Sequence, residues 1–524
     1  MSSSAAIWAA SKGGALSPLS LSSAELAFGT AVTLNIVGAT AGSALSSSDL
    51  PMGWTLNSAA RTISGTPNKR GSIAFSITET LAGKANSPKT TALGLFVADA
   101  APSATALASA IDGAIGRGIR PRNERIAVIG DSIAYGNSFS ASATNVKLYA
   151  KGYLNWASFL GRQRWSFRNQ DNFGGSGDNT NDVILRIDAA LAATTAGTVV
   201  LDCLTNDGPN GISLAQSKTN YQLLIAKILE SGKVCICITP RPRDITASSL
   251  TMTATQYRDH LARRDFVLGL HNPGAGIYAV DMWRYLADPA SANGAMRANF
   301  SYDGLHPGVL GGYWGGKALA ELLGTGRGHG LFPFRDVLPG QNSDVFNASY
   351  PRGCVNSNPM MQGGTTAATG YTVGGGSGVT ATGSKASPPS GRTDIQQIVL
   401  GGTGSAAGDV FDFYQTISAG NLAVGDVVEA FAEVEYDSLS GLTSHGLTLV
   451  DTGNFSNIVG FLVDSTDINA MPFVLPEPVQ GVMRTPRLTL SSTTLRAGMK
   501  GRSINGQAVA CTYRVGAMSV RKVI

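Results

Sequence analysis

The sequence predicts a multidomain protein whose centre is a three-layer α/β/α sandwich with a parallel sheet, flanked by a β-sandwich on either side. Three observations lead to this fold class. The chain has 524 residues, enough for about three domains. Between residues 123 and 329, apolar runs without polar alternation are separated by helical patterns, as in parallel sheets covered on both faces. Before and after that region, short runs alternate apolar and polar residues between turns, which is typical of antiparallel strands.

The N-terminal region combines an arm, a β domain and a linker. Residues 1–22 are rich in serine, alanine and glycine, and we expect an arm there. Residues 23–100 predict a β-sandwich of about 80 residues. The segments Leu50–Asn57 and Thr62–Pro67 resemble the immunoglobulin-like repeat of bacterial surface proteins. This resemblance implies an Ig-like spacer, with ligand binding as the alternative role. Residues 101–122 predict a linker with helical character.

The central domain, expected at residues 123–329, alternates strands and helices. Its strands are predicted at residues 126–129, 198–203, 234–239 and 277–280, and its helices at 154–161, 182–193, 220–231, 255–266 and 313–323. Parallel strands place their carboxyl ends at one edge of the sheet, where open α/β sheets bind their ligands. We therefore expect the reactive side chains directly after these strands.

The C-terminal region, residues 330–524, returns to alternating runs such as Val427–Tyr436. Length and pattern predict a jelly-roll-like β-sandwich. Similar domains accompany carbohydrate-active enzymes, so carbohydrate binding is one expected role and assembly is the other. The first role rests on fold analogy alone.

Composition excludes several classes of function. The net charge of +5 is small for this length, and no basic run contains interleaved aromatic residues, so we expect no nucleic-acid partner. The sequence contains no run of ~20 apolar residues, so it predicts no membrane span. Five irregularly spaced cysteines and five scattered histidines predict neither a disulfide framework nor a metal site.

The expected location follows from the low charge content and the N-terminal sequence. Charged residues make up 14% of the chain, against a usual ~25%. The N-terminal residues lack the basic and apolar segments of a standard secretory signal. A β-rich, cysteine-poor chain of this kind fits a phage tail component in the virion. The alternative is an extracellular protein whose signal has been removed.

Two short segments carry the elements of nucleophilic catalysis. Gly130-Asp131-Ser132 follows the apolar run Arg125–Ile129, which places Ser132 just past a buried strand. Asp303-Gly304-Leu305-His306 separates a carboxylate from an imidazole by three residues, so one local turn can present both. A serine hydroxyl becomes a strong nucleophile when an imidazole takes its proton and a carboxylate fixes the imidazole tautomer.

With two further segments, these motifs resemble the SGNH (GDSL-type) hydrolases. The four blocks are Gly130–Gly136, Asn172–Thr180, Leu204–Asp207 and Asp303–Pro307, in the order found in the family. The resemblance covers about two-fifths of the chain and implies a flavodoxin-like hydrolase fold that needs no cofactor. It also implies a catalytic triad of Ser132, Asp303 and His306.

The resemblance further implies an oxyanion hole. Its donors are the backbone N–H groups of Ser132 and Gly177 and the side-chain amide of Asn206, and each such donor is worth several kcal/mol to the transition state. Two departures from the family pattern stand nearby. Leu204 occupies a place that usually holds glycine, and Gly308 one that often holds asparagine.

Several site residues also have a purely structural interpretation. Ser132 could cap a helix, and Asn206 could belong to a tight Asn-Asp-Gly turn. Gly174 or Gly175 could replace Gly177 if the register of that loop is shifted.

Three residues are candidates for substrate binding. The ring of Tyr135 could stack on a sugar. Arg241 and Arg243, which follow the predicted strand at 234–239, could meet an anionic sugar or remain solvated loop residues.

These expectations combine into one function and two alternatives. The principal hypothesis is a serine esterase that removes short acyl groups, above all O-acetyl, from a polysaccharide such as a bacterial capsule or O-antigen. A lipase or thioesterase on the same fold is the first alternative. The second is a non-catalytic tail protein that binds glycan as a receptor. A homo-oligomer is expected if the chain is a tail protein, in which case it would be a trimer.

Overall fold

The structure is a computed structural model, and it divides the chain into two compact units, residues 1–116 and 117–524. The residues it describes are 19–22, 25–27, 31–66, 71–82, 84, 86–98, 121–142, 145–246, 251–326, 328, 330–347, 349–386, 394–405, 409–418, 420–456, 458–461 and 477–523. Most of the predicted arm and nearly all of the predicted linker lie outside the described residues.

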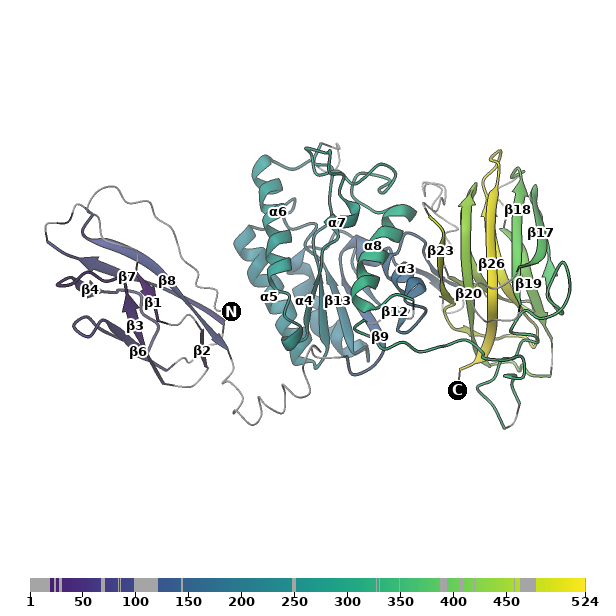
Figure 1. Cartoon of the computed structure of the whole chain (residues 1–524), viewed down its shortest axis with the longest axis horizontal. Helices are drawn as coiled ribbons and strands as arrows, with labels where there is room; N and C mark the ends of the chain where they lie inside the picture. The colour runs from purple at the N-terminus through teal and green to yellow at the C-terminus, as the bar shows by residue number, and fades with distance from the viewer. Residues whose placement is uncertain are drawn as a thin grey trace. The chain divides into compact units, whose positions relative to one another are not determined.

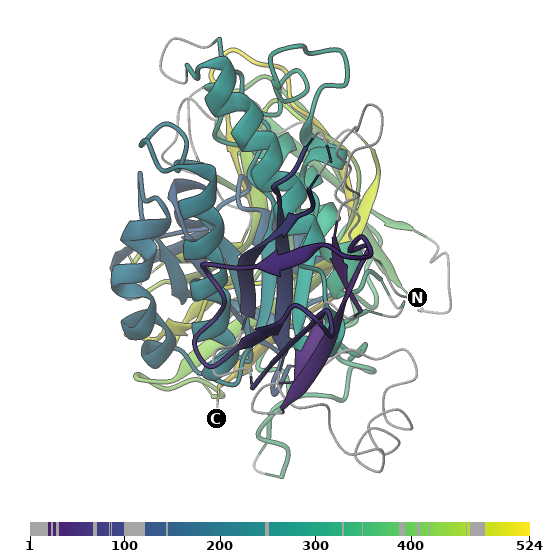
Figure 2. The ribbon, with the colours of Figure 1, turned by 90° about the vertical axis from the view of Figure 1, so that its left-hand side faces the viewer.

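The first unit holds two four-stranded sheets, drawn in purple in Figures 1 and 2. One sheet has the order β1-β3-β6-β5 and the other β2-β8-β7-β4. The strands are β1 (Ser20–Leu21), β2 (Glu25–Ala27), β3 (Val32–Val37), β4 (Ala44–Ser46), β5 (Thr55–Asn57), β6 (Thr62–Gly65), β7 (Gly71–Thr80) and β8 (Lys89–Ala98). Leu34 and Ile63 of the first sheet share a buried core with Phe75 and Ile77 of the second. An Ig-like relationship for this unit stays a prediction.

The second unit is built around a parallel five-stranded sheet of order β12-β9-β13-β14-β15. Its strands are β9 (Arg125–Gly130), β12 (Ser166–Gly174), β13 (Thr198–Asp202), β14 (Val234–Ile238) and β15 (Ile277–Val280). The helices are α2 (Ser132–Tyr135), α3 (Tyr153–Leu160), α4 (Thr180–Ala193), α5 (Leu214–Glu230), α6 (Ala254–Gly269), α7 (Trp283–Leu286) and α8 (Val309–Leu323), with a 3-10 turn η1 at Pro273–Ala275. Each predicted helix and strand of this domain has its counterpart here.

Helices cover both faces of the central sheet. Val183 of α4 and Leu224 of α5 pack with Leu201 on one face. Leu154 of α3 and Leu319 of α8 pack in the core of the other face. Figure 1 shows α4, α5 and α6 on one side of the sheet and α3 and α8 on the other. The predicted α/β/α layering of the central domain is therefore present.

Strand β12 is an addition to the predicted sheet. Its sequence, Ser166–Gly174, is mostly polar and gives no apolar run. The strand is instead held at the edge of the sheet by polar contacts, because Asp171 is fully buried and lies 2.6 Å from the guanidinium of Arg125. Helix α5 also begins earlier than predicted, at Leu214, since Ser213 caps it by accepting from the Gln216 amide.

The C-terminal region forms two sheets over a shared core. One sheet has the order β17-β18-β26-β20-β23, with β24 paired to β20, and the other has the order β10-β11-β22-β21-β25-β19-β16. The strands are β16 (Thr372–Val373), β17 (Val379–Ala386), β18 (Ile395–Gly402), β19 (Asp409–Ile417), β20 (Val427–Ser440), β21 (Leu442–Asp451), β22 (Ile458–Phe461), β23 (Val479–Arg484), β24 (Leu488–Thr489), β25 (Leu495–Ser503) and β26 (Ala510–Lys522). A jelly-roll topology stays a prediction.

The predicted boundary between residues 329 and 330 does not separate two independent domains. Strands β10 (Ser138–Ser142) and β11 (Asn145–Leu148) come from the hydrolase segment but extend the seven-stranded sheet of the C-terminal region. The pairing of β11 with β22 is parallel and sets Val146 against Val459. A strand that completes a sheet belongs structurally to that sheet, so β10 and β11 join the two regions.

Side-chain contacts strengthen the same junction. Arg162, after α3, forms a buried ion pair with Glu433 at 2.7 Å. The α3 backbone also packs directly on β23, where a Cβ at Gly481 would lie 2.3 Å from the Phe159 carbonyl oxygen. On α8, Tyr313 and Lys317 both donate to Glu477. The unit therefore behaves as one body from 117 to 524.

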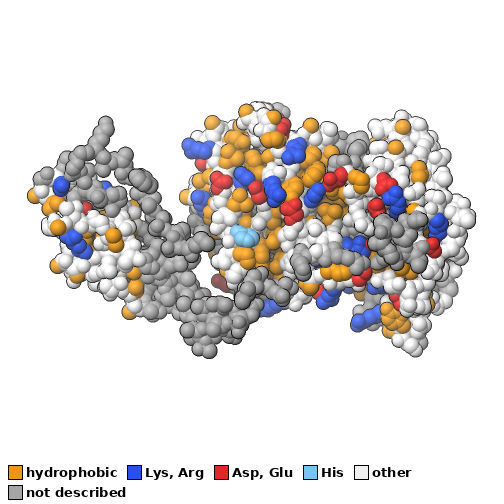
Figure 3. Space-filling view, in the orientation of Figure 1, with side chains coloured by type: hydrophobic (Ala, Val, Ile, Leu, Met, Phe, Trp, Pro, Cys, Tyr) orange, Lys and Arg blue, Asp and Glu red, His pale blue; other side chains and the backbone are white. Residues whose placement is uncertain are grey.

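The visible surface reflects the composition. On the face shown in Figure 3, acidic and basic side chains intermingle over the central domain, whereas the C-terminal region is largely uncharged. None of the helices in the described part of the chain is long and apolar enough to cross a membrane.

Candidate active site

Ser132 lies in a tight turn between β9 and α2. Asp131, rather than Ser132, is the helix cap, since its carboxylate accepts from the Ile133 amide at 2.8 Å. The residue before Asp131 is Gly130, and the backbone here passes close to β13. A Cβ on Gly130 would lie 1.9 Å from the Asp202 carbonyl oxygen, so a larger residue would not fit. Ser132 is the first helical residue and is half-buried at the carboxyl edge of the sheet.

The structure brings the three predicted triad residues together. The Nε2 atom of His306 lies 2.8 Å from the Ser132 hydroxyl oxygen. The Nδ1 atom of His306 lies 2.6 Å from Asp303 Oδ2. Asp303 Oδ1 accepts in addition from the backbone amides of His306 and Leu305, at 2.7 and 2.9 Å. Gly304, with φ of 89°, makes the turn that allows this.

The charge of Asp303 is stabilised by its surroundings. Partial burial acts to raise the pKa of this carboxyl, but the hydrogen bonds from the His306 ring, the His306 amide and the Leu305 amide outweigh it and lower the pKa to about 2. Asp303 is therefore ionised at neutral pH. An ionised carboxylate at Nδ1 keeps that nitrogen protonated and leaves Nε2 to accept the serine proton.

Three N–H groups near Ser132 have no acceptor in the part of the chain that the structure describes. They are the backbone N–H groups of Ser132 and Gly177 and one N–H of the Asn206 amide, whose other N–H donates to the Asp178 carbonyl at 2.9 Å. The neighbouring loop glycines are already engaged. The amide of Gly175 donates to Gly130 and that of Gly174 to the Asn172 side chain. The unshifted register, with Gly177 as the donor, thus agrees with the hydrogen bonding.

The loop that carries Gly177 is held by Arg186 of α4, which the sequence did not single out. Its guanidinium pairs with the Asp178 carboxylate at 2.6 Å. It also donates to the carbonyl oxygens of Phe173, at the end of β12, and Gly130, at the end of β9. One side chain thereby joins both strand ends to the loop. An arginine two turns inside a helix carries no signal in the sequence that would reveal this role.

Asp207 fixes the other loop. Its two carboxylate oxygens accept from the backbone amide and the hydroxyl of Thr180, the first residue of α4, at 2.8 and 3.0 Å. The Asn206 carbonyl accepts from the Asn210 amide, so a turn is also present. The turn is compatible with the oxyanion role of Asn206, which stays a prediction.

Arg241 and Arg243 are not surface residues, contrary to both interpretations of their sequence. Arg241 is 1% exposed, donates to Asp202 at 2.9 Å and lies over the Tyr153 ring. Arg243 is 3% exposed and donates to the Thr205 carbonyl. Their burial does not support contact with a sugar. Tyr135, the third candidate, is 52% exposed and sits one turn after Ser132.

Asp131 and Asp202 form a buried carboxyl pair beneath Ser132. Burial, together with the charge of Asp202, raises the pKa of Asp131 to about 8. Burial also raises the pKa of Asp202, although Arg241 opposes the rise. Burial of the two carboxyls together therefore favours the protonated form of the pair.

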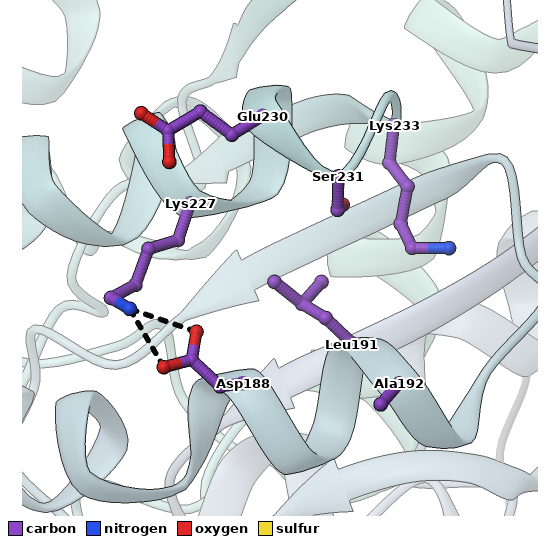
Figure 4. A pocket seen from close by; sticks show the side chains of 7 residues that line it. All are labelled: Asp188, Leu191, Ala192, Lys227, Glu230, Ser231 and Lys233. Carbon is purple, nitrogen blue, oxygen red and sulfur yellow. Dashed lines mark hydrogen bonds and ion pairs between the residues drawn. The ribbon is translucent and has the colours of Figure 1, made fainter.

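A separate hollow of about 390 Å³ lies away from Ser132. Figure 4 shows the side chains that line it. It is lined by Asp188, Leu191, Ala192, Lys227, Glu230, Ser231 and Lys233, from the last turns of α4 and α5 and the segment before β14. These segments lie at the amino edge of the parallel sheet, opposite Ser132. Among the described residues, no group of His, Cys, Asp and Glu side chains is arranged to hold a metal ion.

Comparison with known proteins finds a family model that matches part of the second unit. Residues 128–312 match the model of the GDSL-like Lipase/Acylhydrolase family. No curated protein sequence matches the chain. Similar solved structures include a GDSL-like lipase from Bacteroides thetaiotaomicron, with 13% identity over 42% of this chain and 96% of its own and a TM-score of 0.30.

Two further solved structures are similar to the same degree. The lipase/acylhydrolase from Enterococcus faecalis has 19% identity over 38% of this chain and 94% of its own, with a TM-score of 0.28. The acetyl xylan esterase AlAXEase has 15% identity over 38% of this chain and 98% of its own, with a TM-score of 0.29. On the strength of the family model, residues 128–312 form a hydrolase domain of the GDSL/SGNH family.

Proposed function

We propose that the protein is a serine esterase that removes short acyl groups, above all O-acetyl, from a polysaccharide. The observation that carries this proposal is the hydrogen-bonded series Asp303, His306 and Ser132, with distances of 2.6 and 2.8 Å. The GDSL-type family match supports ester hydrolysis as the class of reaction.

In this proposal, each step of acyl transfer uses one of these groups. His306 takes the proton of Ser132 as the hydroxyl attacks the ester carbonyl carbon. The negative oxygen that forms is met by the backbone N–H groups of Ser132 and Gly177 and by the Asn206 N–H that does not donate to Asp178. His306 then protonates the departing sugar alcohol. Water follows the same route, releasing the acid from the acyl-enzyme and restoring the Ser132 hydroxyl.

The openness of the site supports a bulky alcohol. The side chains of His306 and Asp303 are 27% and 34% exposed, and Gly177 is exposed as well. A base that reaches the surface can act on an ester that projects from a polymer, whereas sites for lipid chains bury most of their ligand. A bacterial capsule or O-antigen is the polymer we propose, and a virion tail or the cell exterior is the place.

Two assays test the proposal together. The first compares kcat/KM for p-nitrophenyl acetate, butyrate and octanoate, and the second measures acetate released from O-acetylated bacterial polysaccharide. We expect the acetate ester to be preferred by about tenfold or more over the octanoate ester and acetate to be released from the polymer. Preference for octanoate would favour a lipase or thioesterase instead. Binding of the polymer without release of acetate would favour a receptor role.

A further inference from the structure

The ring of Tyr302 lies beside that of His306 and nearly parallel to it. The two ring centroids are 5.8 Å apart and the ring planes differ by 14°. Tyr302 is 40% exposed, so its ring is not simply core filling. Neither the triad nor the oxyanion donors include it.

The loop itself creates this contact. The Tyr302 amide donates to the His306 carbonyl at 3.3 Å, and the Ser301 hydroxyl donates to the same oxygen at 2.8 Å. One step further out, the Gly308 amide donates to the Phe300 carbonyl. The segments on either side of Gly304 therefore run side by side. This pairing brings residues 302 and 306 into register as neighbours.

The hydrogen bonds of His306 hold its ring at the two nitrogens, Nδ1 by Asp303 and Nε2 by Ser132. Neither bond places a group against the face of the imidazole. An aromatic ring that runs nearly parallel to the imidazole limits movement of the ring out of its plane, and its face favours the cationic imidazolium that forms during the reaction.

We propose that Tyr302 is a positioning residue for His306, which holds the imidazole plane in line with the Ser132 hydroxyl. The proposal rests on the esterase function proposed above. Its ring, and not its hydroxyl, carries the role, so phenylalanine can replace it.

Several charged side chains face Tyr302 and His306, and a test of the proposal must leave these side chains unchanged. Asp303 faces His306 at Nδ1. The ammonium group of Lys151 lies 5.7 Å from the centre of the Tyr302 ring and 5.1 Å from that of Tyr149. Arg243 interacts electrostatically with Asp303. A substitution at Tyr302 leaves all of these groups in the chain.

The test compares Tyr302→Leu and Tyr302→Phe with wild type across the pH range of activity, with p-nitrophenyl acetate as substrate. In Tyr302→Leu we expect kcat to fall about tenfold with little change in KM. The acidic limb of its kcat/KM profile, which reports protonation of the base, should move to lower pH by about 0.5 unit. Tyr302→Phe should retain kcat within about twofold of wild type, and the acidic limb of its kcat/KM profile should lie at the same pH as in wild type.

A matched control separates this effect from loss of an exposed tyrosine in general. Tyr350 is 45% exposed and lies outside the hydrolase motifs, so Tyr350→Leu should leave kcat and the pH profile unchanged. An unchanged kcat and acidic limb in Tyr302→Leu would overturn the proposal. Equal loss in Tyr302→Phe, or a rise in KM alone, would also overturn it, because the hydroxyl or the substrate would then be the partner.

A second measurement does not depend on turnover. The ring protons of His306 can be followed by NMR through a pH titration in wild type and in Tyr302→Leu. We expect the chemical shifts to lose the ring-current contribution of Tyr302 and the titration midpoint to fall by about 0.5 unit. If wild type hydrolyses no ester but this difference remains, the esterase function fails while the positioning contact stands. If the titrations coincide, the positioning role fails.

Discussion

The guanidinium of Arg186 lies 2.6 Å from the carboxylate of Asp178, the residue that follows Gly177 in the candidate oxyanion loop. The same guanidinium donates to two carbonyl oxygens at the carboxyl edge of the sheet. Arg186 thereby links the position of the Gly177 amide to the strand that ends in Ser132.

Arg186→Ala should therefore lower kcat without much change in KM. Loss of one oxyanion donor typically costs ~10²–10³ in kcat, and a displaced donor should cost somewhat less, about 10- to 100-fold. Steady-state kinetics on p-nitrophenyl acetate measures this. Lys227→Ala is the control, since Lys227 pairs with Asp188 beside the hollow at the opposite edge of the sheet (Figure 4). Equal activity in the two variants would argue against the proposed role of the loop.

Asn206→Ala tests the side-chain donor directly. One amide N–H of Asn206 is engaged by Asp178 and the other is available to an oxyanion. Its removal should reduce kcat by about 10²–10³ and leave KM nearly unchanged. Asn210, an exposed residue of the same loop, gives the matched control Asn210→Ala. A fall of less than about fivefold in Asn206→Ala would exclude Asn206 from the oxyanion hole.

The buried carboxyl pair predicts a pH-dependent stability. Because the pKa of Asp131 is raised to about 8 in the folded protein, from an ordinary value near 3.8, the protonated form is favoured by folding. This contribution is complete below about pH 4 and is lost as the pH rises through about 8. The titration belongs to Asp131 and Asp202 jointly.

Asp131→Asn should reduce this dependence. The amide stays neutral, and its oxygen can still accept from Ile133 as the helix cap. We expect Tm to fall less between about pH 5 and about pH 9 in this variant than in wild type, as measured by differential scanning fluorimetry. Asp188→Asn, at a largely exposed carboxylate, should track wild type. Parallel Tm curves for wild type and Asp131→Asn would show that the pair does not titrate as inferred.

The shared sheet predicts opposite outcomes for two truncations. Removal of residues 1–116 takes away a separate compact unit and should leave a soluble enzyme of wild-type kcat. Removal of residues 330–524 strips β22 from β11 and exposes the core that both regions share, so we expect aggregation or a large loss of Tm. Solubility, circular dichroism and ester hydrolysis measure both. A soluble, fully active fragment ending at residue 329 would contradict the single-body description.

The sequence was informative where chemistry and local pattern coincide. Apolar runs without alternation located four of the five central strands, because buried parallel strands need apolar residues on both faces. The motifs around Ser132 and His306 could be recognised because the turn requires their glycines and aspartates, while the reaction requires their serine and histidine. Ser132 directly follows β9, as expected for a reactive side chain of a parallel sheet, whereas Asp303 and His306 lie in the loop between α7 and α8.

What the sequence left hidden depends on contacts between distant segments. Polar residues after a strand predict a solvated loop, yet Arg241 and Arg243 are buried. Arg241 donates to the Asp202 carboxylate and Arg243 donates to the Thr205 carbonyl. The stacking of Tyr302 on His306 requires the two arms of one loop to pair. The pairing of β11 with β22 joins residues more than three hundred positions apart, and no local pattern specifies such a partner.

The central claim is that Ser132 is the nucleophile of an esterase, and the most direct measurement is hydrolysis of p-nitrophenyl acetate by wild type, Ser132→Ala and Ser231→Ala. Ser231 is a matched serine of the same domain at the opposite edge of the sheet. The account predicts that wild type and Ser231→Ala hydrolyse the ester alike, and that kcat in Ser132→Ala falls on the order of 10⁵–10⁶-fold with the fold intact. Activity in Ser132→Ala equal to wild type, or no activity in any of the three proteins, would contradict it.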